Sequence, residues 1–389
     1  MLLNQLWQAI PALQAAFEDQ AWGEDREKVW VLLRRLMTAP APSGGVTLPG
    51  AIFDELTDIA AAFGLADRLD ADLAGMGSGG LWLGVEKDHP DLLVLTHLDR
   101  PSFRVHSLEE AQNPVLFSLV VPSPIEATIR LPARALRYDP DRGQLVTAAR
   151  GQLFSLLDHD NGDEALWVFQ VQSGAVSCLD TITLDFAPVR QGDVIQGSGL
   201  DNAAGVLTAL GAAALLRQAE QALLEQNRRC LFLFCDQHTT EIGAGRRPEG
   251  IVWSWPALGS VIVDAQPVHH APVLRHGAGI GYAFASAGEN GLIVPPHYQC
   301  LTHDLAQAFN DFTSQPMAQA HCRTAAHRYH HLGRGRTLGL FGPSLSYTAQ
   351  GMEQVSLRDI QAGIGWLACF LALTLNLVPE VVARYALDR

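Results

Sequence analysis

Runs of apolar residues that end in polar ones are the main pattern of the sequence. Residues 92–95 are apolar at four successive positions, which indicates a strand that is buried on both faces of a sheet. We expect further strands at 230–236 and 260–266, and a helix rich in Ala and Leu at 202–223. This alternation predicts an α/β fold with a mixed, mostly parallel sheet flanked by helices.

The pattern changes in the middle of the chain, where Pro, Gly and an Asp-Asn-Gly signal separate short β-rich pieces. The clearest pieces are 115–121, 126–131 and 166–171. They predict an inserted all-β domain of barrel or sandwich type, with the barrel type preferred. We therefore expect a β domain at 104–189 that interrupts one α/β domain made of residues 1–103 and 190–389.

Two apolar segments near the ends of the chain are interpreted as helices of a globular protein. The first twenty residues have polar positions at helical intervals and no basic region, so they predict an amphipathic helix rather than a signal peptide. The run at 364–378 is too short and interrupted for a bilayer span, and it predicts a buried helix that begins near Asp359.

Composition narrows the class of protein. The chain has 389 residues and a net charge of −14, which argues against binding to nucleic acid. Six scattered cysteines without CxxC spacing indicate reduced thiols, and hence a cytoplasmic protein. No GxSxG motif is present, which argues against a serine hydrolase with a nucleophile elbow.

Polar side chains occupy the carboxyl ends of the predicted strands, where open α/β sheets bind ligands. His97, Asp99 and Asp264 are at such ends, Glu241 follows a strand after a short loop, and Asp201 precedes a helix. Each has an ordinary explanation, because His-x-Asp is common at loop starts and Asp is a good helix N-cap. Together, His, Asp and Glu residues on successive elements of one sheet indicate a divalent metal site. Asp99 would orient the His97 ring or support it from outside the ligand set.

In their order and neighbouring residues, these motifs resemble those of the tetrahedral or glutamyl aminopeptidases, family forty-two of the metallopeptidases. The segments that carry the resemblance along nearly the whole chain are 36-LMTAPAPSGG-45, 96-THLD-99, 200-LDNAAG-205, 240-TEIGA-244, 263-VDAQ-266 and 343-PSLSYTAQGMEQVSLRD-359. The resemblance implies a zinc-aminopeptidase-like fold and a homo-oligomer that assembles through the β insert. It implies a peptide or small amide as substrate, cut at a free amino terminus. The net charge and the short apolar runs argue against nucleic acid and membrane as partners.

The resemblance also implies roles for individual residues. His97 and Asp264 would bind one divalent ion, Zn or Co, while Asp201 would bridge to a second ion bound by Glu241. Asp99 would support His97. In such chemistry two ions activate a water and polarise the scissile carbonyl, while a glutamate acts as general base.

At two positions this sequence lacks a residue that the family uses for catalysis or metal binding. The position of the general base holds Thr240, whose hydroxyl is not a base at neutral pH. The position of the second metal's histidine holds Ala349, which offers no ligand. The second ion is then left with Asp201 and Glu241, too few for a tight four-coordinate site.

Nearby histidines offer substitutes. If the alignment shifts within 234–243, His238 takes the position of the base, as a base or as a metal ligand. The pair His269 and His270 follows Asp264 closely. A third group is dense but matches no standard zinc spacing: His321, Cys322, His327, His330 and His331. Each group also fits an exposed polar loop, and the sequence leaves both interpretations open.

Three functions remain open from the sequence. The first is a working metal-dependent aminopeptidase or related amide hydrolase with one or two divalent ions per chain. The second is an inactive homologue that keeps the fold and serves as a binding or structural subunit, which the losses at Thr240 and Ala349 favour. The third is a mononuclear hydrolase that uses His238 as its base.

Overall fold

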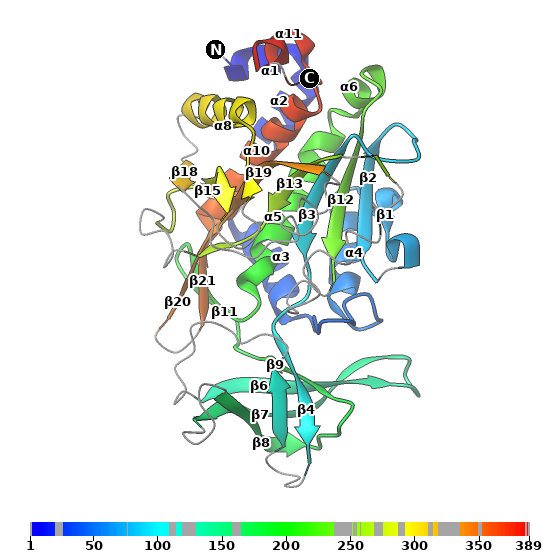
Figure 1. Ribbon diagram of the computed structural model, residues 1–389, viewed down its shortest axis with the longest axis vertical. Helices are drawn as coiled ribbons and strands as arrows, with labels where there is room; N and C mark the ends of the chain where they lie inside the picture. Colours follow the sequence, from blue (N-terminus) through cyan, green and yellow to red (C-terminus); the bar gives the residue numbers. More distant parts are fainter. Residues whose placement is uncertain are drawn as a thin grey trace.

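The computed structural model divides the chain into three parts along its long axis (Figure 1). Helices from both ends of the sequence lie at one end, the main sheet lies in the middle, and a barrel lies at the other end. The structure describes residues 2–19, 26–75, 77–108, 114–118, 130–157, 165–236, 251, 255–256, 258–267, 275–286, 292–309, 314–317, 335–348, 352–385 and 387.

The main sheet contains eight strands in the order β1-β2-β12-β3-β13-β19-β15-β18. Their bounds, in that order, are Leu69–Asp70, Gly79–Gly84, Arg229–Cys235, Leu92–His97, Leu258–Val263, Gly335–Gly342, Ile280–Ala283 and Ser314–Met317. Strands β12, β3, β13 and β19 are parallel. Strand β2 runs antiparallel to β1 and β12, and β15 runs antiparallel to β19 but parallel to β18. The predicted mixed, mostly parallel sheet is therefore confirmed.

Helices accompany this sheet, and the two 18-residue helices are almost entirely buried. The helices are α1 Leu2–Ala9, α2 Pro11–Asp19, α3 Arg26–Thr38, α4 Ile52–Ala62, α5 Leu200–Arg217, α6 Glu220–Glu225, α8 Pro296–Ala308, α10 Leu357–Thr374 and α11 Pro379–Val382. Helices α5 and α10 pack along each other behind the sheet (Figure 1). Both are apolar on nearly all sides, as expected for helices without a solvent face.

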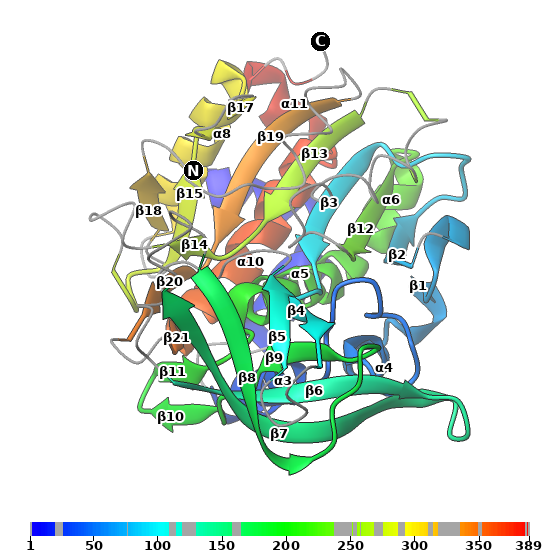
Figure 2. The ribbon, with the colours of Figure 1, turned by 60° about the horizontal axis from the view of Figure 1, so that its bottom comes forward.

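Six strands form a closed barrel in the order β4-β5-β8-β7-β6-β9 (Figure 2). Their bounds are Ser102–Ser107, Val115–Ser118, Leu131–Asp139, Gln144–Leu157, Ala165–Gly174 and Thr181–Leu184 for β4 to β9 in sequence order. The barrel interior is filled by apolar side chains that include Phe103, Trp167 and Phe169. The barrel type of insert predicted from the β-rich pieces is confirmed, and closure leaves it without a free sheet edge.

A smaller five-stranded sheet, β10-β11-β21-β20-β14, lies beside the main sheet and the barrel (Figure 2). Its strands are Val189–Gln191, Val194–Gly197, Glu353–Ser356, Ser344–Tyr347 and Gln266–Pro267 in that order. A two-stranded ribbon, β16 Ala285–Ser286 and β17 Leu292–Ile293, completes the strands of the described residues. The five-stranded sheet brings the segment after residue 343 next to the segment that precedes α5, far away in sequence.

Two arginines join the barrel to the α/β part at the carboxyl end of α3. Arg100 donates hydrogen bonds to the carbonyl oxygens of Met37 and Ala39, at 2.8 and 3.1 Å. Arg134, in the barrel strand β6, donates to those of Thr38 and Ala39, at 3.0 and 3.3 Å. Burial, and then the charge of Arg134, lower the pKa of Arg100 to about 10. The two cations satisfy the carbonyl groups that a helix leaves without partners at this end.

Three expected helices differ in detail from the structure. The helix expected at 202–223 is two helices, α5 and α6, and the amino-terminal helix breaks before Pro11, which has no N–H to donate. The buried helix expected to begin near Asp359 begins at Leu357. No single described helix is long and apolar enough to cross a membrane, although α10 and the segment 379–385, bent by 87°, reach the required length together.

Candidate metal site

The carboxyl ends of two neighbouring parallel strands carry His97 and Asp264. Strand β3 ends at His97, and β13 ends at Val263, one residue before Asp264. Leu95 pairs with Ile262 across the two strands, so both polar residues leave the sheet at the same level. These strand ends face the barrel (Figure 1), and both side chains are buried. The strand runs thus place both ligand candidates at the edge where the sequence predicted a site.

The two ring nitrogens of His97 have different neighbours. Nδ1 lies 3.0 Å from the backbone oxygen of Asp99, a distance at which the ring N–H donates to that carbonyl. The Asp99 carboxylate lies farther away, with Oδ1 at 3.8 Å from Nδ1. Nε2 is therefore left to face Asp201 and Asp264, as a metal-binding imidazole requires. Asp99 orients His97 through its main chain rather than through its acid group.

Asp201 lies opposite His97 because the start of α5 is irregular. Asp201 and Asn202 have non-helical φ and ψ angles. The side-chain oxygen of Asn202, not that of Asp201, accepts the N–H of Gly205 and so caps the helix, at 3.1 Å. The ordinary explanation of Asp201 as an N-cap therefore does not hold, and its carboxylate is one-third exposed beside His97.

Asn202 also connects the two strands that carry the site. Its amide nitrogen donates to Thr96 Oγ1 and to the Val263 oxygen, both at 2.9 Å. Its side-chain oxygen accepts the N–H of Ala265 at 3.1 Å, in addition to the Gly205 N–H. One buried amide thus fixes the ends of β3 and β13 relative to the helix that carries Asp201.

Glu353 supports Asp201 from the smaller sheet. Its carboxylate accepts hydrogen bonds from the backbone N–H groups of Leu200 and Asp201. Burial, and then the charge of Asp201, raise the pKa of Glu353 to about 8, against these hydrogen bonds and the charge of Arg100. Sequence reasoning gave Glu353 no role, although it lies within the motif-like segment 343–359.

Three ligand atoms converge at this place. His97 Nε2 lies 3.3 Å from Asp201 Oδ1 and 3.4 Å from Asp264 Oδ1. Among the described residues, these three side chains form the group that could hold a metal ion, with all ligand atoms within 4.8 Å of one another. One imidazole and two carboxylates are a donor set that suits zinc or a similar divalent ion.

The clustered carboxylates of this group raise the pKa values of neighbouring side chains. Burial disfavours a charged His97, but the carboxylates of Asp264 and Asp201 outweigh it and raise the pKa of His97 well above its usual value. Burial, and then the charges of Asp201 and Glu353, raise the pKa of the Tyr347 phenol. Tyr347, at the end of β20, therefore keeps its proton and can act as a hydrogen-bond donor beside the carboxylates.

The loop after α3 completes one side of the site. The hydroxyl of Ser43 donates to the buried carboxylate of Asp99. The N–H of Gly44 donates to Asp236 Oδ1 at 2.9 Å, and Asp236 follows β12, the neighbour of β3. The segment 36–45, quoted above for its resemblance, is thus bound to the ends of two central strands.

Several predicted residues lie outside the described residues, and their placement is not part of the description. They are Thr240, Glu241, His238, Ala349, His269, His270 and the group of His and Cys residues at 321–331. The described part of the predicted site therefore consists of His97, Asp99, Asp201 and Asp264.

Comparison with known proteins shows a fold of aminopeptidase type. No protein-family model and no curated protein matches the sequence. Among solved structures, the aminopeptidase APDkam598 from the archaeon Desulfurococcus kamchatkensis is similar over 93% of this chain and 99% of its own, with a TM-score of 0.67 and 17% identity.

Two further structures define the fold more closely. The TET aminopeptidase from a marine sediment archaeon, Thaumarchaeota archaeon SCGC AB-539-E09, covers 92% of this chain and 99% of its own at TM-score 0.66 and 15% identity. The Pyrococcus horikoshii TET1 peptidase, which assembles into a tetrahedron or a large octahedral shell, covers 88% and 98% at TM-score 0.65 and 14% identity. The chain has the fold of these TET peptidases.

Proposed function

We propose that this protein is a metal-dependent hydrolase of aminopeptidase type that cuts peptides or small amides at a free amino terminus. The observation that carries the proposal is the convergence of His97, Asp201 and Asp264 at the carboxyl edge of the sheet, with ligand atoms within 4.8 Å. The aminopeptidases of the same fold support the peptide substrate.

The chain's own residues have separate tasks in this proposal. His97, Asp201 and Asp264 hold one divalent ion, zinc or cobalt, and Glu241 with Asp201 would hold a second. Asp99 fixes the ring of His97, and Asn202 keeps the three ligands at their spacing. When bound, the metal supplies a Lewis acid that polarises a carbonyl and makes water a better nucleophile.

Tyr347 and the base position complete the site. The protonated phenol of Tyr347 lies close to the metal ligands and donates a hydrogen bond to a substrate oxygen that becomes negative during the reaction. With Thr240 at the family's base position, His238 is the proposed base, because an imidazole accepts a proton near neutral pH and a hydroxyl does not.

The protein acts in the cytoplasm as a homo-oligomer in this proposal. The shells formed by the Pyrococcus horikoshii TET1 peptidase support self-assembly. The free cysteines among the described residues support a reducing compartment.

The second candidate function is an inactive homologue that binds a partner or a single metal ion. The identities of Thr240 and Ala349 favour it, because both replace residues that the resembled family uses for chemistry. The two candidates share the fold and the three ligands, so metal binding alone does not separate them.

The deciding experiment measures metal content and hydrolysis in the same preparations. The wild-type protein and the variants Asp264→Asn and Asp141→Asn are equilibrated with zinc or cobalt, and bound metal is counted by elemental mass spectrometry. Asp141 is an exposed acid in a turn of the barrel and is the matched control. A peptide library with free and with acetylated amino termini is then incubated with each protein, and products are read by mass spectrometry.

Each result has a distinct meaning. Bound metal with cleavage of free amino termini, both lost in Asp264→Asn and kept in Asp141→Asn, supports the hydrolase. Bound metal without cleavage of any peptide supports the second candidate. No metal in the wild-type protein, or equal metal in both variants, contradicts the metal site itself.

A further inference from the structure

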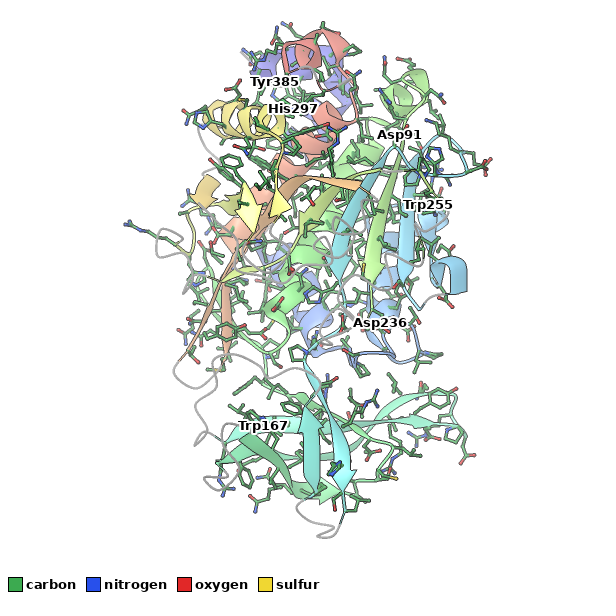
Figure 3. The ribbon with its side chains drawn as sticks, viewed as in Figure 1. Asp91, Trp167, Asp236, Trp255, His297 and Tyr385 are labelled. Atoms are coloured by element: carbon green, nitrogen blue, oxygen red, sulfur yellow. The ribbon has the colours of Figure 1, made fainter. Side chains whose placement is uncertain are left out.

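A cavity lies at the opposite edge of the main sheet from the candidate metal site. It has a volume of about 520 Å³ and is lined in part by Asp91, Gly259 and Arg336, at the amino ends of β3, β13 and β19. Figure 3 shows Asp91 and His297 at this end, whereas Asp236 marks the end that carries the metal site. Five steps of β3 separate Leu92 from His97, about 17 Å at about 3.3 Å per residue.

The cavity carries an excess of positive charge in a chain whose net charge is −14. Its charged lining residues are Arg228, Arg336 and Asp91, with His297 beside them. The single acid is already satisfied, because Asp91 accepts from Lys87 at 2.8 Å and from the backbone N–H of Arg229 at 2.7 Å. Arg228 Nη1 also lies 3.8 Å from Asp91 Oδ1, so its charge is shared with that acid. The lining keeps a net positive charge, most of it on Arg336.

Two polar atoms of residues that line the cavity also lack a hydrogen-bond partner within the described part of the chain. Among the described residues, Nε of Arg228 and Oγ1 of Thr374 are buried and have no hydrogen-bond partner. Arg336 is exposed and forms no ion pair with a described acid. Buried donors without partners are rare in folded proteins, and at a cavity they indicate a ligand.

The first turn of α8 adds to this field. His297 and Tyr298 follow Pro296, the first residue of the 13-residue helix, and both line the cavity. The first turn contains no acidic residue, and the N–H groups of Tyr298 and Gln299 already donate to the carbonyl oxygen of Pro295, at 3.0 and 3.1 Å. Burial, and then the charge of Arg336, lower the pKa of His297, so the two side chains share one electrostatic environment. Two arginines with a histidine beside them favour an anionic ligand with several acceptor oxygens, such as a doubly charged oxyanion.

Beside Tyr298, Thr374 and Asn376, four leucines line part of the cavity. They are Leu92, Leu338, Leu375 and Leu387. The volume exceeds what a bare phosphate ion fills, and these side chains offer contacts to an organic group.

We propose that this cavity binds a small phosphate monoester, with its phosphate between Arg228, Arg336 and His297 and its organic group against the leucines. The site is separate from the metal ligands, so the proposal goes beyond the proposed hydrolase and does not depend on it.

The test is titration calorimetry of the full-length protein with adenosine 5′-monophosphate, glucose 6-phosphate, adenosine and inorganic phosphate. We expect one saturable site per chain for at least one of the two monoesters. The variant Arg336→Gln should bind it at least tenfold more weakly, because it loses a charge-assisted hydrogen bond. Arg336 is exposed, so its replacement is not expected to disturb folding.

The control is Arg142→Gln, which removes an exposed arginine from the barrel turn far from the cavity. It should bind the monoester as the wild type does. Saturable binding of neither monoester, or equal binding by both variants, would overturn the proposal. Binding of inorganic phosphate alone would mean an adventitious ion only and would overturn it too. Metal content measured in the same samples keeps this result separate from that of the hydrolase.

Discussion

The hydroxyl of Ser43 donates a hydrogen bond to the carboxylate of Asp99, although 56 residues separate the two in the sequence. Asp99 is fully buried, and its backbone oxygen in turn holds Nδ1 of His97. Ser43 thus fixes the residue that orients the imidazole. The loop after α3 therefore bears on the candidate metal site through Asp99.

We expect Ser43→Ala to weaken zinc binding. The variant leaves the Asp99 carboxylate without this donor and lets the chain around His97 shift. Groups that orient metal ligands contribute about 10- to 100-fold to affinity, and the effect here should lie near tenfold because Asp99 acts through its main chain. Competition with a zinc-binding dye measures it. Ser173→Ala, on an exposed position of β8, should leave the affinity unchanged, and an equal loss in both variants would contradict the role of Ser43.

Asn202→Ala should destabilise the fold. The amide makes four hydrogen bonds to buried groups that would lose their partner. Unsatisfied buried groups cost about 1–3 kcal/mol each, so a loss of about 3 kcal/mol in the free energy of unfolding is expected after partial relaxation. Urea denaturation followed by circular dichroism measures it. The exposed Gln221→Ala on α6 should change stability by less than about 0.5 kcal/mol, and a similarly small change in Asn202→Ala would show that the amide is dispensable.

Tyr347→Phe should lower the rate of peptide hydrolysis without loss of metal. The phenol keeps its proton beside the carboxylates, so its removal takes away a donor for the substrate oxygen. Loss of such a donor lowers kcat by about 100-fold. Steady-state kinetics on an aminoacyl para-nitroanilide, with metal content measured in parallel, test this. Tyr138→Phe, on a half-exposed tyrosine of the barrel, is the control, and an unchanged kcat in Tyr347→Phe would refute the role of the phenol.

The stability of the protein should depend on pH through Asp359, in the first turn of α10. Burial raises the pKa of Asp359 to about 7, against hydrogen bonds from the N–H groups of Gly279 and Gly277. Between its usual pKa of 3.8 and about 7, the folded state holds a proton that the unfolded state has lost. This contribution to stability is complete below the lower value and disappears as pH rises through the upper one.

Asp359→Asn cannot ionise and removes this pH dependence. The difference in unfolding free energy between wild type and variant should therefore be larger at about pH 5 than at about pH 8, as measured by urea denaturation. Asp141→Asn, on the exposed turn, should show the same difference at both values. A difference that stays constant for Asp359→Asn would mean that its carboxyl is ionised throughout.

The sequence predicted the sheet and the ligand candidates from local information. Apolar runs identify β3, β12 and β13, and parallel strands bring His97 and Asp264 to one edge regardless of details elsewhere. The barrel type followed from short β-rich pieces between turn signals. Strand β2 was not assigned separately, because two glycines at its start weaken the strand pattern.

The supporting residues of the site could not be predicted in the same way. Glu353 contacts the backbone of Leu200 across 153 positions, a contact that depends on how β21 pairs with β11. Asn202 stands beside Asp201 in the sequence, but its pattern fits an ordinary helix start, and its links to Thr96 and Val263 arise from tertiary packing. Asp99 was expected to orient His97 with its side chain. In the structure its backbone oxygen does so, and a side-chain motif cannot predict a backbone contact.

The junction at the carboxyl end of α3 resists movement of the barrel relative to the rest of the molecule. Residues 98–101 alone connect the strand that carries His97 to the first barrel strand. Arg100 lies within this connection and is anchored to α3, and Arg134 anchors the barrel to the same helix end. Moving the barrel relative to the α/β part would therefore require these hydrogen bonds at the carboxyl end of α3 to break.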